Sequence, residues 1–172
     1  NSNNYHRRSI RLKGYDYTNP GYYFVTICTD NHACILGYIE NGEMRLNKYG
    51  KIIEECLRWL AIQYSYISLD AFIMMPNHIH SIIIINDNDE RRGGSRTAPT
   101  KRKSLGRLIG VFKTVSAKKI NAIRKITNST IWQRNYYEHI IRNEEELNEI
   151  REYIINNPLK WELDEENPRN FK

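Results

Sequence analysis

The sequence "ISLDAFIMMPNHIHSIIII", residues 67 to 85, contains two apolar runs that predict a pair of neighbouring antiparallel strands. The runs are interrupted at Pro76-Asn77, where proline lacks a donor for the ladder and asparagine favours a turn. Side chains alternate between the two faces of a strand, so His78 and His80 are expected on one face and Ile79 on the other.

The segments on either side of this pair predict further strands. "YYFVTICT" (22 to 29) follows a Pro-Gly turn and is rich in β-branched and aromatic residues, which is typical of a central strand. A short hairpin is expected at 35 to 46, because Asn41-Gly42 tolerates the positive φ of a tight turn. "YYEHIIR" (136 to 142) predicts one more strand.

The spacing of apolar residues predicts three helices. Apolar residues recur every three or four positions from 47 to 64 and from 105 to 126, which indicates two amphipathic helices. A third helix is expected to begin after Asn143, whose side chain can cap the first turn while Glu146 reaches back. It should end near 155 to 157, because the proline that follows biases the residue before it away from helical dihedrals.

This order of elements predicts an α+β fold, a ferredoxin-like or RRM-like antiparallel sheet packed by helices, with an extra C-terminal helix. The length of 172 residues suits one domain with its own core, so residues 1 to 172 are expected to form a single domain. Residues 86 to 104 have no apolar period and many charged and turn-forming residues, which is typical of a mobile basic connector.

Composition limits the class of protein. Unbroken apolar runs such as Ile82 to Ile85 are far short of a bilayer span, and the first residues lack the apolar segment of a signal peptide, so a cytoplasmic protein is expected. The cysteines (Cys28, Cys34 and Cys56) are odd in number and show no CxxC spacing. This pattern favours reduced, buried thiols over disulfides or a zinc site.

Charge is segregated along the chain. The formal net charge is +6, yet residues 91 to 125 contain twelve basic residues and no acidic one, whereas residues 143 to 172 contain nine acidic and four basic residues. A stretch of one sign favours a polyphosphate partner, most simply nucleic acid, over a solubilising loop followed by an amphipathic helix. The N-terminal arm, in which Arg11 and Lys13 alternate with tyrosines such as Tyr15, agrees, since aromatic rings stack on unpaired bases.

The spacing of His78 and His80 alone leaves three interpretations open. The two imidazoles could bind one divalent ion with a third ligand from elsewhere, form a satisfied half-buried pair, or belong to an aromatic surface for nucleic acid. The other histidines number three and no Cys pair is present, so a structural zinc cage is not expected.

The stretch "MMPNHIHSIIII", residues 74 to 85, resembles the His-hydrophobic-His (HUH) motif of the single-tyrosine transposases of insertion sequences and their REP-associated relatives. Three other blocks resemble successive blocks of the REP-associated branch: "YYFVTICTDNHACILG", "SLGRLIGVFKT" and "IWQRNYYEHIIRNEEELNEIREYIINNPLKWEL". The resemblance covers roughly residues 5 to 163. His-x-His is common by itself, whereas the ordered set of blocks is specific.

The resemblance implies a set of site residues. The nucleophile would be Tyr153, and His78, His80 and Asn157 would hold Mg²⁺ or Mn²⁺. Tyr153 and Asn157 are about one helical turn apart and so share a face, in agreement with the predicted helix. Asn157 stands where some relatives have Gln, and Met75 where some have an acidic residue. Without the resemblance Tyr136 and Tyr137 would be equal candidates, and Tyr137 remains the alternative nucleophile.

The resemblance also implies the function and the partner. We expect a metal-dependent endonuclease and strand transferase that acts on hairpin-bearing single-stranded DNA through a 5′-phosphotyrosine intermediate, and that associates with the nucleoid when bound to DNA. The residues expected to contact DNA are Arg11, Lys13, Tyr15, Arg107, Lys113, Lys118 and Arg134. A non-catalytic single-stranded nucleic-acid-binding module of RRM-like fold and a water-using metallohydrolase are the alternatives. Insertion-sequence relatives act as dimers and REP-associated ones can act as monomers, so a monomer is favoured over a homodimer.

Overall fold

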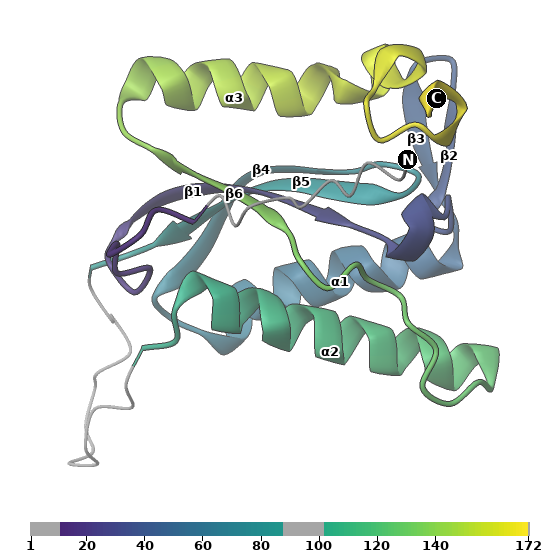
Figure 1. Ribbon diagram of the computed structural model, residues 1–172, viewed down its shortest axis with the longest axis horizontal. Coiled ribbons are helices and arrows are strands. Elements are labelled where there is room, and N and C mark those ends of the chain that lie inside the picture. The colour runs from purple at the N-terminus through teal and green to yellow at the C-terminus, as the bar shows by residue number, and fades with distance from the viewer. Residues whose placement is uncertain (1–10, 88–101, 172) are drawn as a thin grey trace, which may run out of the picture.

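A four-stranded antiparallel sheet forms the centre of the computed structural model, which describes residues 11 to 87 and 102 to 171 (Figure 1). The strands are β1 (Gly21–Cys28), β4 (Ile67–Met74), β5 (His78–Ile85) and β6 (Tyr137–Ile141), in the order β4-β5-β1-β6. Since the first and third of these strands in chain order are central and each is followed by a helix, the sheet has the ferredoxin-like topology. The predicted α+β class is confirmed.

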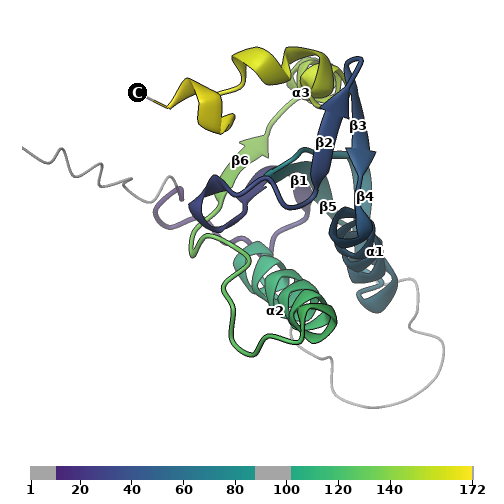
Figure 2. The same ribbon diagram turned by 90° about the vertical axis from the view of Figure 1, so that its right-hand side faces the viewer.

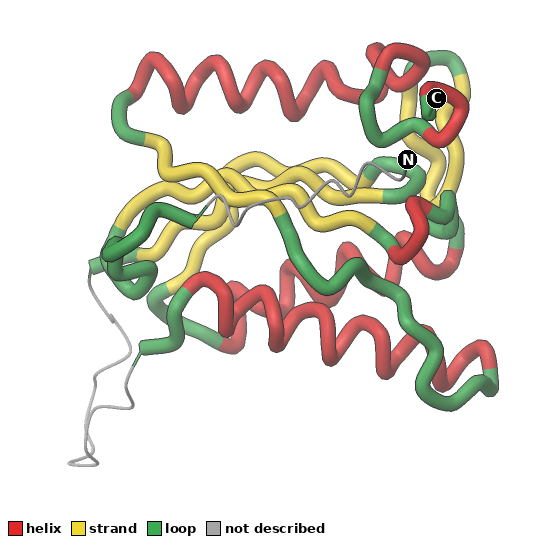
Figure 3. The backbone as a smooth tube through the Cα atoms, in the orientation of Figure 1, coloured by secondary structure: helices red, strands yellow, loops and turns green. Residues whose placement is uncertain are grey.

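Helices cover both faces of the sheet. α1 (Lys48–Gln63) and α2 (Leu105–Arg124) pack together on one face, and α3 (Glu144–Asn156) lies on the opposite face (Figures 1 and 2). The tube in Figure 3 shows the same layers, with the chain passing from α2 through β6 to α3. The predicted hairpin is present as β2 (Gly37–Glu40) and β3 (Glu43–Leu46), and both of its turn residues, Asn41 and Gly42, have positive φ.

The larger part of the core lies between the sheet and the pair α1 and α2. Alternate residues of the two central strands enter it, including Tyr23, Val25 and Ile27 of β1 and Ile79, Ile83 and Ile85 of β5. Because the intervening residues point to the other face, the same alternation directs the two histidines of β5 toward α3.

α3 begins at its predicted cap, but one half of the capping arrangement differs. Asn143 Oδ1 accepts a hydrogen bond from the backbone N–H of Glu146 at 2.8 Å, as predicted. The Glu146 carboxylate accepts from the backbone N–H of Arg142 at 2.8 Å and contacts the ring of His139, and not the N–H of Asn143. Two carboxylate oxygens thus join β6 to the first turn of α3.

α3 ends at Asn156, within the predicted range, although the reasoning from proline was wrong. Asn157 keeps helical dihedrals (φ −59°, ψ −42°), because a 3₁₀ helix, η2 (Asn157–Leu163), continues directly from α3 with Pro158 in its first turn. The continuation keeps Asn157 in helical register with Tyr153.

Apolar and ionic contacts both attach α3 to the sheet. A small core cluster joins the helix to the strands and consists of Leu147, Ile154, Phe24, Ile82 and Ile141. Arg151 donates hydrogen bonds to both carboxylate oxygens of Asp70, from Nε at 2.8 Å and from Nη2 at 2.6 Å. Asp70 lies where the register between β4 and β5 shifts, and such irregularities commonly redirect a side chain.

Other expectations meet a mixed outcome. Cys28 and Cys56 are buried as predicted, but Cys34 is exposed because it lies in the loop between η1 (Asp30–His32) and β2.

Most of the expected connector, residues 88 to 101, lies outside the described residues. Within the described ranges, no helix combines the length and the apolar character needed to cross a bilayer.

Candidate active site

His78 and His80 lie side by side on the face of β5 that α3 covers. Both are buried, and their Nε2 atoms are 3.1 Å apart. Ile79, between them, points into the core on the other side of the sheet, as the strand alternation predicts. Two ring nitrogens therefore converge on one point under α3.

Asn77 determines which nitrogen of His78 carries a proton. The Asn77 Nδ2 group donates to the backbone carbonyl oxygens of His32 at 3.0 Å and Glu166 at 2.6 Å, so Oδ1 is the atom that faces the His78 ring. His78 Nδ1 lies 2.8 Å from that oxygen and must donate to it, because an amide oxygen only accepts. The lone pair of His78 is consequently on Nε2 and points into the site.

His80 has a partner on its outer nitrogen as well. Nδ1 lies 2.9 Å from Thr26 Oγ1, and Phe24 stacks on the ring at a centroid distance of 5.5 Å. A hydroxyl can donate or accept, so His80 can present either a proton or a lone pair at Nε2. When His80 Nδ1 donates to Thr26, the Nε2 atoms of His78 and His80 both carry lone pairs that face each other. These lone pairs repel unless a cation lies between them.

A proton shared between the two histidine rings is disfavoured, because both rings are buried. Burial lowers the pKa of His78 well below its ordinary value, and the neighbouring charge of His80 lowers it further. Burial likewise lowers the pKa of His80 to about 3. Both rings are therefore neutral at physiological pH, which is the state in which imidazole binds a metal ion.

Tyr153 reaches the histidine pair from α3. Its hydroxyl lies 3.4 Å from Nε2 of His80, and the two rings meet edge to face with centroids 5.1 Å apart. The side chain is 43% exposed, so the hydroxyl is not sealed in the interior. Burial of part of the ring raises the pKa of the phenol, and the charge of Asp164 raises it further.

Two oxygen-bearing side chains of the segment after α3 complete the cluster. Asn157 is buried, and its Oδ1 makes no hydrogen bond of ordinary geometry with any described residue. Its side chain nevertheless lies close enough to raise the pKa of His78 and to lower that of Tyr153. Asp164 places Oδ2 3.8 Å from Nε2 of His78, and the ligand atoms of His78, His80 and Asp164 all lie within 4.8 Å of one another.

The sequence analysis did not identify Asp164, Asn77 or Thr26. Asp164 belongs to the acidic run of residues 164 to 166, and nothing in its spacing distinguishes it from its neighbours. Asn77 was interpreted only as a turn residue. Thr26 lies opposite His80 in the register of β1 and β5, so this contact follows from strand pairing, which the sequence does not specify residue by residue.

The cluster opens into a pocket of about 1010 Å³ between the sheet, α3 and the C-terminal segment. Its lining includes Tyr153, His80 and Asn157 together with the basic residues Arg11, Arg134 and Lys160. Tyr137, the alternative nucleophile, also lines the pocket and is 43% exposed. Asp164, Glu165 and Glu166 line it as well, so charges of both signs surround the candidate nucleophile.

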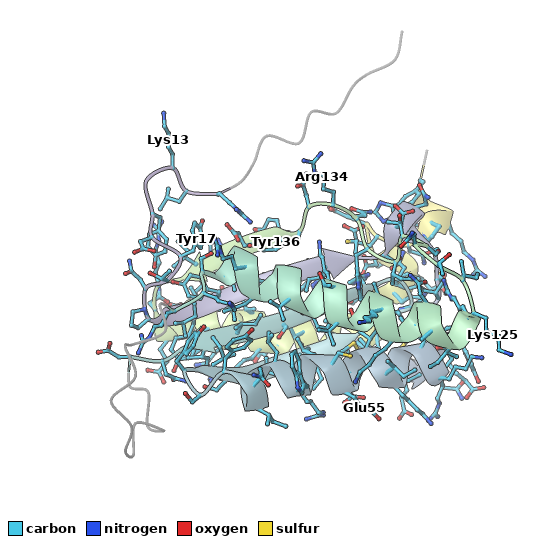
Figure 4. All side chains as sticks on the ribbon, turned by 90° about the horizontal axis from the view of Figure 1, so that it is seen from below. Lys13, Tyr17, Glu55, Lys125, Arg134 and Tyr136 are labelled. Atoms are coloured by element: carbon cyan, nitrogen blue, oxygen red, sulfur yellow. The ribbon has the colours of Figure 1, made fainter. Side chains whose placement is uncertain are left out.

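Four of the residues predicted to contact DNA lie on the N-terminal segment and the loop before β6. Arg11 donates to the hydroxyl of Tyr136 at 3.0 Å and forms an ion pair with Glu138 at 3.3 Å, at the wall of the pocket. Lys13 and Arg134 are exposed and extend toward the same side of the molecule (Figure 4). Tyr15 packs against two other tyrosines and donates to, or accepts from, one of their hydroxyls, which leaves less of its ring available for stacking.

The other three predicted DNA contacts lie on α2, across the sheet from α3. Arg107 and Lys118 are exposed there. Lys113 instead turns inward, where Nζ donates to the backbone carbonyl oxygens of Gln133 at 2.8 Å and Asn135 at 3.0 Å, and burial lowers its pKa to about 8. Of the predicted basic set, only Arg11 and Arg134 line the pocket, whereas Arg107 and Lys118 lie exposed on α2.

Two Haemophilus influenzae proteins are similar to the chain in sequence. No protein-family model matches the chain. A Haemophilus influenzae protein named "Uncharacterized protein" is 40% identical over 173 residues, which cover 96% of this chain and 95% of that protein, so the two belong to one family. A second Haemophilus influenzae protein, named "Putative REP-associated tyrosine transposase", is 27% identical over 146 residues, 84% of this chain and 74% of that protein.

The fold has relatives among solved structures. A REP-associated tyrosine transposase bound to a REP hairpin superposes with a TM-score of 0.58 at 18% identity, over 87% of this chain and 73% of that one. The chain is thus similar in sequence to one putative REP-associated tyrosine transposase and similar in fold to another protein of that name. A "putative transposase" from Deinococcus radiodurans has the same fold, with a TM-score of 0.50 at 17% identity over 85% of this chain and 95% of that one.

Proposed function

We propose that this transposase relative is a metal-dependent single-stranded DNA endonuclease and strand transferase that uses Tyr153 as its nucleophile. The observation that carries the proposal is the 3.4 Å distance between the Tyr153 hydroxyl and Nε2 of His80. Nε2 of His78 lies 3.1 Å from the same His80 nitrogen. A nucleophile and two metal-ligand atoms converge, and Tyr153 and His80 line one pocket, which is the arrangement that metal-assisted attack on a phosphodiester needs.

The residues present fit a divalent cation. His78 and His80 each have a partner on Nδ1, which leaves Nε2 to bind the ion, as is usual for metal-bound histidines. Asn157 would supply Oδ1, a buried oxygen without a hydrogen-bond partner among the described residues. Asp164 adds a carboxylate that the sequence analysis did not include. Mixed nitrogen and oxygen ligands suit Mn²⁺, and Mg²⁺ is the other candidate.

The chain itself keeps the phenol unreactive. Burial and the charge of Asp164 both raise the pKa of Tyr153, so the phenolate is scarce at neutral pH. A bound divalent cation would supply positive charge for the phenolate and for the nonbridging oxygens of the scissile phosphate. Metal dependence would thus follow from the local electrostatics.

The reaction would exchange one phosphodiester for another. The Tyr153 oxygen loses its proton and bonds to phosphorus, the bond from phosphorus to O3′ breaks, and the departing O3′ takes up a proton. The product is a 5′-phosphotyrosine linkage and a free 3′-hydroxyl. Attack of a second 3′-hydroxyl on the linkage reverses these changes and joins a new strand, which water as the first nucleophile would not permit.

Single-stranded DNA with hairpins is the substrate that we propose. Arg11, Arg134 and Lys160 line the pocket and could neutralise phosphates beside the nucleophile. The solved relative that is bound to a REP hairpin supports this class of ligand. Arg107 and Lys118, on α2, would contact a part of the DNA that extends away from the pocket.

The test uses a labelled single-stranded hairpin with Mn²⁺. The protein should form a denaturant-resistant covalent adduct that is lost in Tyr153→Phe and is retained in Tyr137→Phe, a matched control at the same pocket. Cleavage with 5′ products free of protein would indicate a hydrolase. Salt-sensitive binding without cleavage in any divalent ion would indicate a non-catalytic binding module and would contradict the proposal.

A further inference from the structure

A second group of metal-ligating side chains lies next to the histidine pair. Cys28 is the last residue of β1 and pairs with His78 in the register of β1 and β5. His32 belongs to η1, and Glu166 lies between η2 and the short helix η3 (Pro168–Asn170). The ligand atoms of Cys28, His32 and Glu166 all lie within 4.8 Å of one another, although they come from three separate segments of the chain.

The contact between His32 and Glu166 has the geometry of two ligands rather than of a hydrogen bond. His32 Nδ1 lies 2.8 Å from Glu166 Oε2, yet this buried nitrogen has no hydrogen-bond partner within the described parts of the chain. The carboxylate oxygen is therefore near the nitrogen but off the axis of an N–H bond. Cys28 Sγ is near as well, since the ligand atoms of the three residues lie within 4.8 Å of one another.

Gln133 and Phe171 contact the His32 ring as well. Gln133 Nε2 lies 2.9 Å from His32 Nε2, and Phe171 meets the ring edge to face with centroids 4.9 Å apart. A half-turn of the Gln133 amide exchanges its nitrogen and oxygen, so Gln133 Oε1 can accept a hydrogen bond from the Nε2–H of His32, which leaves the Nδ1 lone pair of His32 for an ion. The backbone N–H of Gln133 donates to the carbonyl oxygen of Cys28 at 3.0 Å, which keeps this residue beside the cluster.

We propose that Cys28, His32 and Glu166 bind a thiophilic divalent cation, with Zn²⁺ the best match, at a site distinct from that of His78 and His80. One sulfur, one nitrogen and one oxygen donor form a set that zinc accepts, with a fourth position left for water. Magnesium and calcium prefer oxygen ligands, so the thiol makes the site selective against them.

The two sites share Asn77. Its amide donates to the backbone carbonyl oxygens of His32 and Glu166, and its Oδ1 holds Nδ1 of His78. An ion bound by the side chains of His32 and Glu166 fixes the two carbonyl groups that orient Asn77. Binding at the second site therefore stabilises the orientation of His78, and it holds the segment that carries Asp164 against β1.

Cobalt provides a probe that separates the two sites. Co²⁺ added to the full chain should produce a near-ultraviolet charge-transfer band that requires a thiolate ligand, and an equimolar amount of Zn²⁺ should remove it. The band should persist in a variant with His78→Gln and His80→Gln, since neither histidine belongs to the second site. Cys34→Ser, which changes an exposed thiol, is the matched control and should keep the band.

Cys28→Ser should lose the band while Glu166→Gln should keep it with an affinity for Co²⁺ lower by at least about tenfold. Circular dichroism shows whether each variant remains folded, and Glu166→Gln tests the site even if Cys28→Ser does not fold. A wild-type protein without the band, or a Glu166→Gln variant with unchanged affinity, would overturn the proposal. Neither result bears on the identity of the nucleophile, because the band reports ligation of an ion by a thiolate and not covalent attachment of DNA.

Discussion

The Tyr153 hydroxyl lies 3.4 Å from Nε2 of His80 although 73 positions separate the two residues in the chain. Their meeting depends on α3, which crosses the same face of the sheet on which the histidine is presented. Ile154, the residue next to the tyrosine, is buried in the cluster that attaches this helix to β1 and β5. The packing of α3 on the sheet therefore determines where the Tyr153 hydroxyl lies.

Loss of the Ile154 side chain should loosen α3. Ile154→Ala removes most of a side chain that is 1% exposed, and such cavities lower the free energy of unfolding by about 2 to 5 kcal/mol. Chemical denaturation measures this loss, and hydrogen exchange should show faster opening of α3. Ile155→Ala is the matched control, because Ile155 is 67% exposed and its truncation should change stability by no more than about 0.5 kcal/mol. Equal effects of the two changes would refute the packing role.

Asn77 should influence metal affinity without touching the ion. Asn77→Ala removes the acceptor that fixes the His78 tautomer, and loss of such a partner commonly weakens metal binding about 10- to 100-fold. Titration with Mn²⁺, followed by calorimetry or electron paramagnetic resonance, measures the change. Asn86→Ala serves as the control, since the Asn86 amide bonds to Ser68 at the other end of β5. An unchanged affinity in Asn77→Ala would show that the tautomer is set in another way.

Asp164 should act on both the ion and the phenol. Asp164→Asn removes a carboxylate 3.8 Å from Nε2 of His78, so the affinity for Mn²⁺ should fall. The same change removes a negative charge that raises the pKa of Tyr153, so ultraviolet titration of the metal-free protein should find that pKa lower than in the wild type. Glu162→Gln, an exposed acid of the same segment, should alter neither quantity. A phenol pKa that stays the same would remove Asp164 from the site.

Acid should destabilise the metal-free protein through the buried histidines. Burial lowers the pKa of His80 to about 3, whereas an unfolded histidine titrates near 6.5, so the unfolded state binds more protons between these values. The free energy of unfolding should therefore decrease as pH falls from about 6.5 toward 3. Urea denaturation at a series of pH values measures this slope, and His80→Gln should reduce it. If the unfolding free energy of the wild type and of His80→Gln depended on pH to the same extent, His80 would not be the source of the acid sensitivity.

The elements of the fold were largely predictable because they depend on local patterns. The alternation in β5 is enough to place His78 and His80 on one face, and the helical period is enough to place Tyr153 and Asn157 together. The end of α3 shows the limit of such rules, since Pro158 begins a 3₁₀ helix and leaves Asn157 helical.

The rest of the site was not predictable because it depends on how distant segments pack. Asp164 and Glu166 reach the sheet through a loop with no periodic pattern, and Lys113 turns inward to bind backbone carbonyl groups that only the folded chain brings near it. Charge along the sequence likewise does not reveal that Arg134 and Arg107 lie on different sides of the sheet. These features follow from tertiary contacts that no single segment encodes.

Peptide mapping of the covalent adduct tests the central claim most directly. After reaction with a single-stranded DNA hairpin and Mn²⁺, proteolysis and mass spectrometry should find the 5′-phosphonucleotide on the peptide that contains Tyr153. A nucleotide attached to Tyr137 or to another residue, or strand cleavage without any attached nucleotide, would contradict the account.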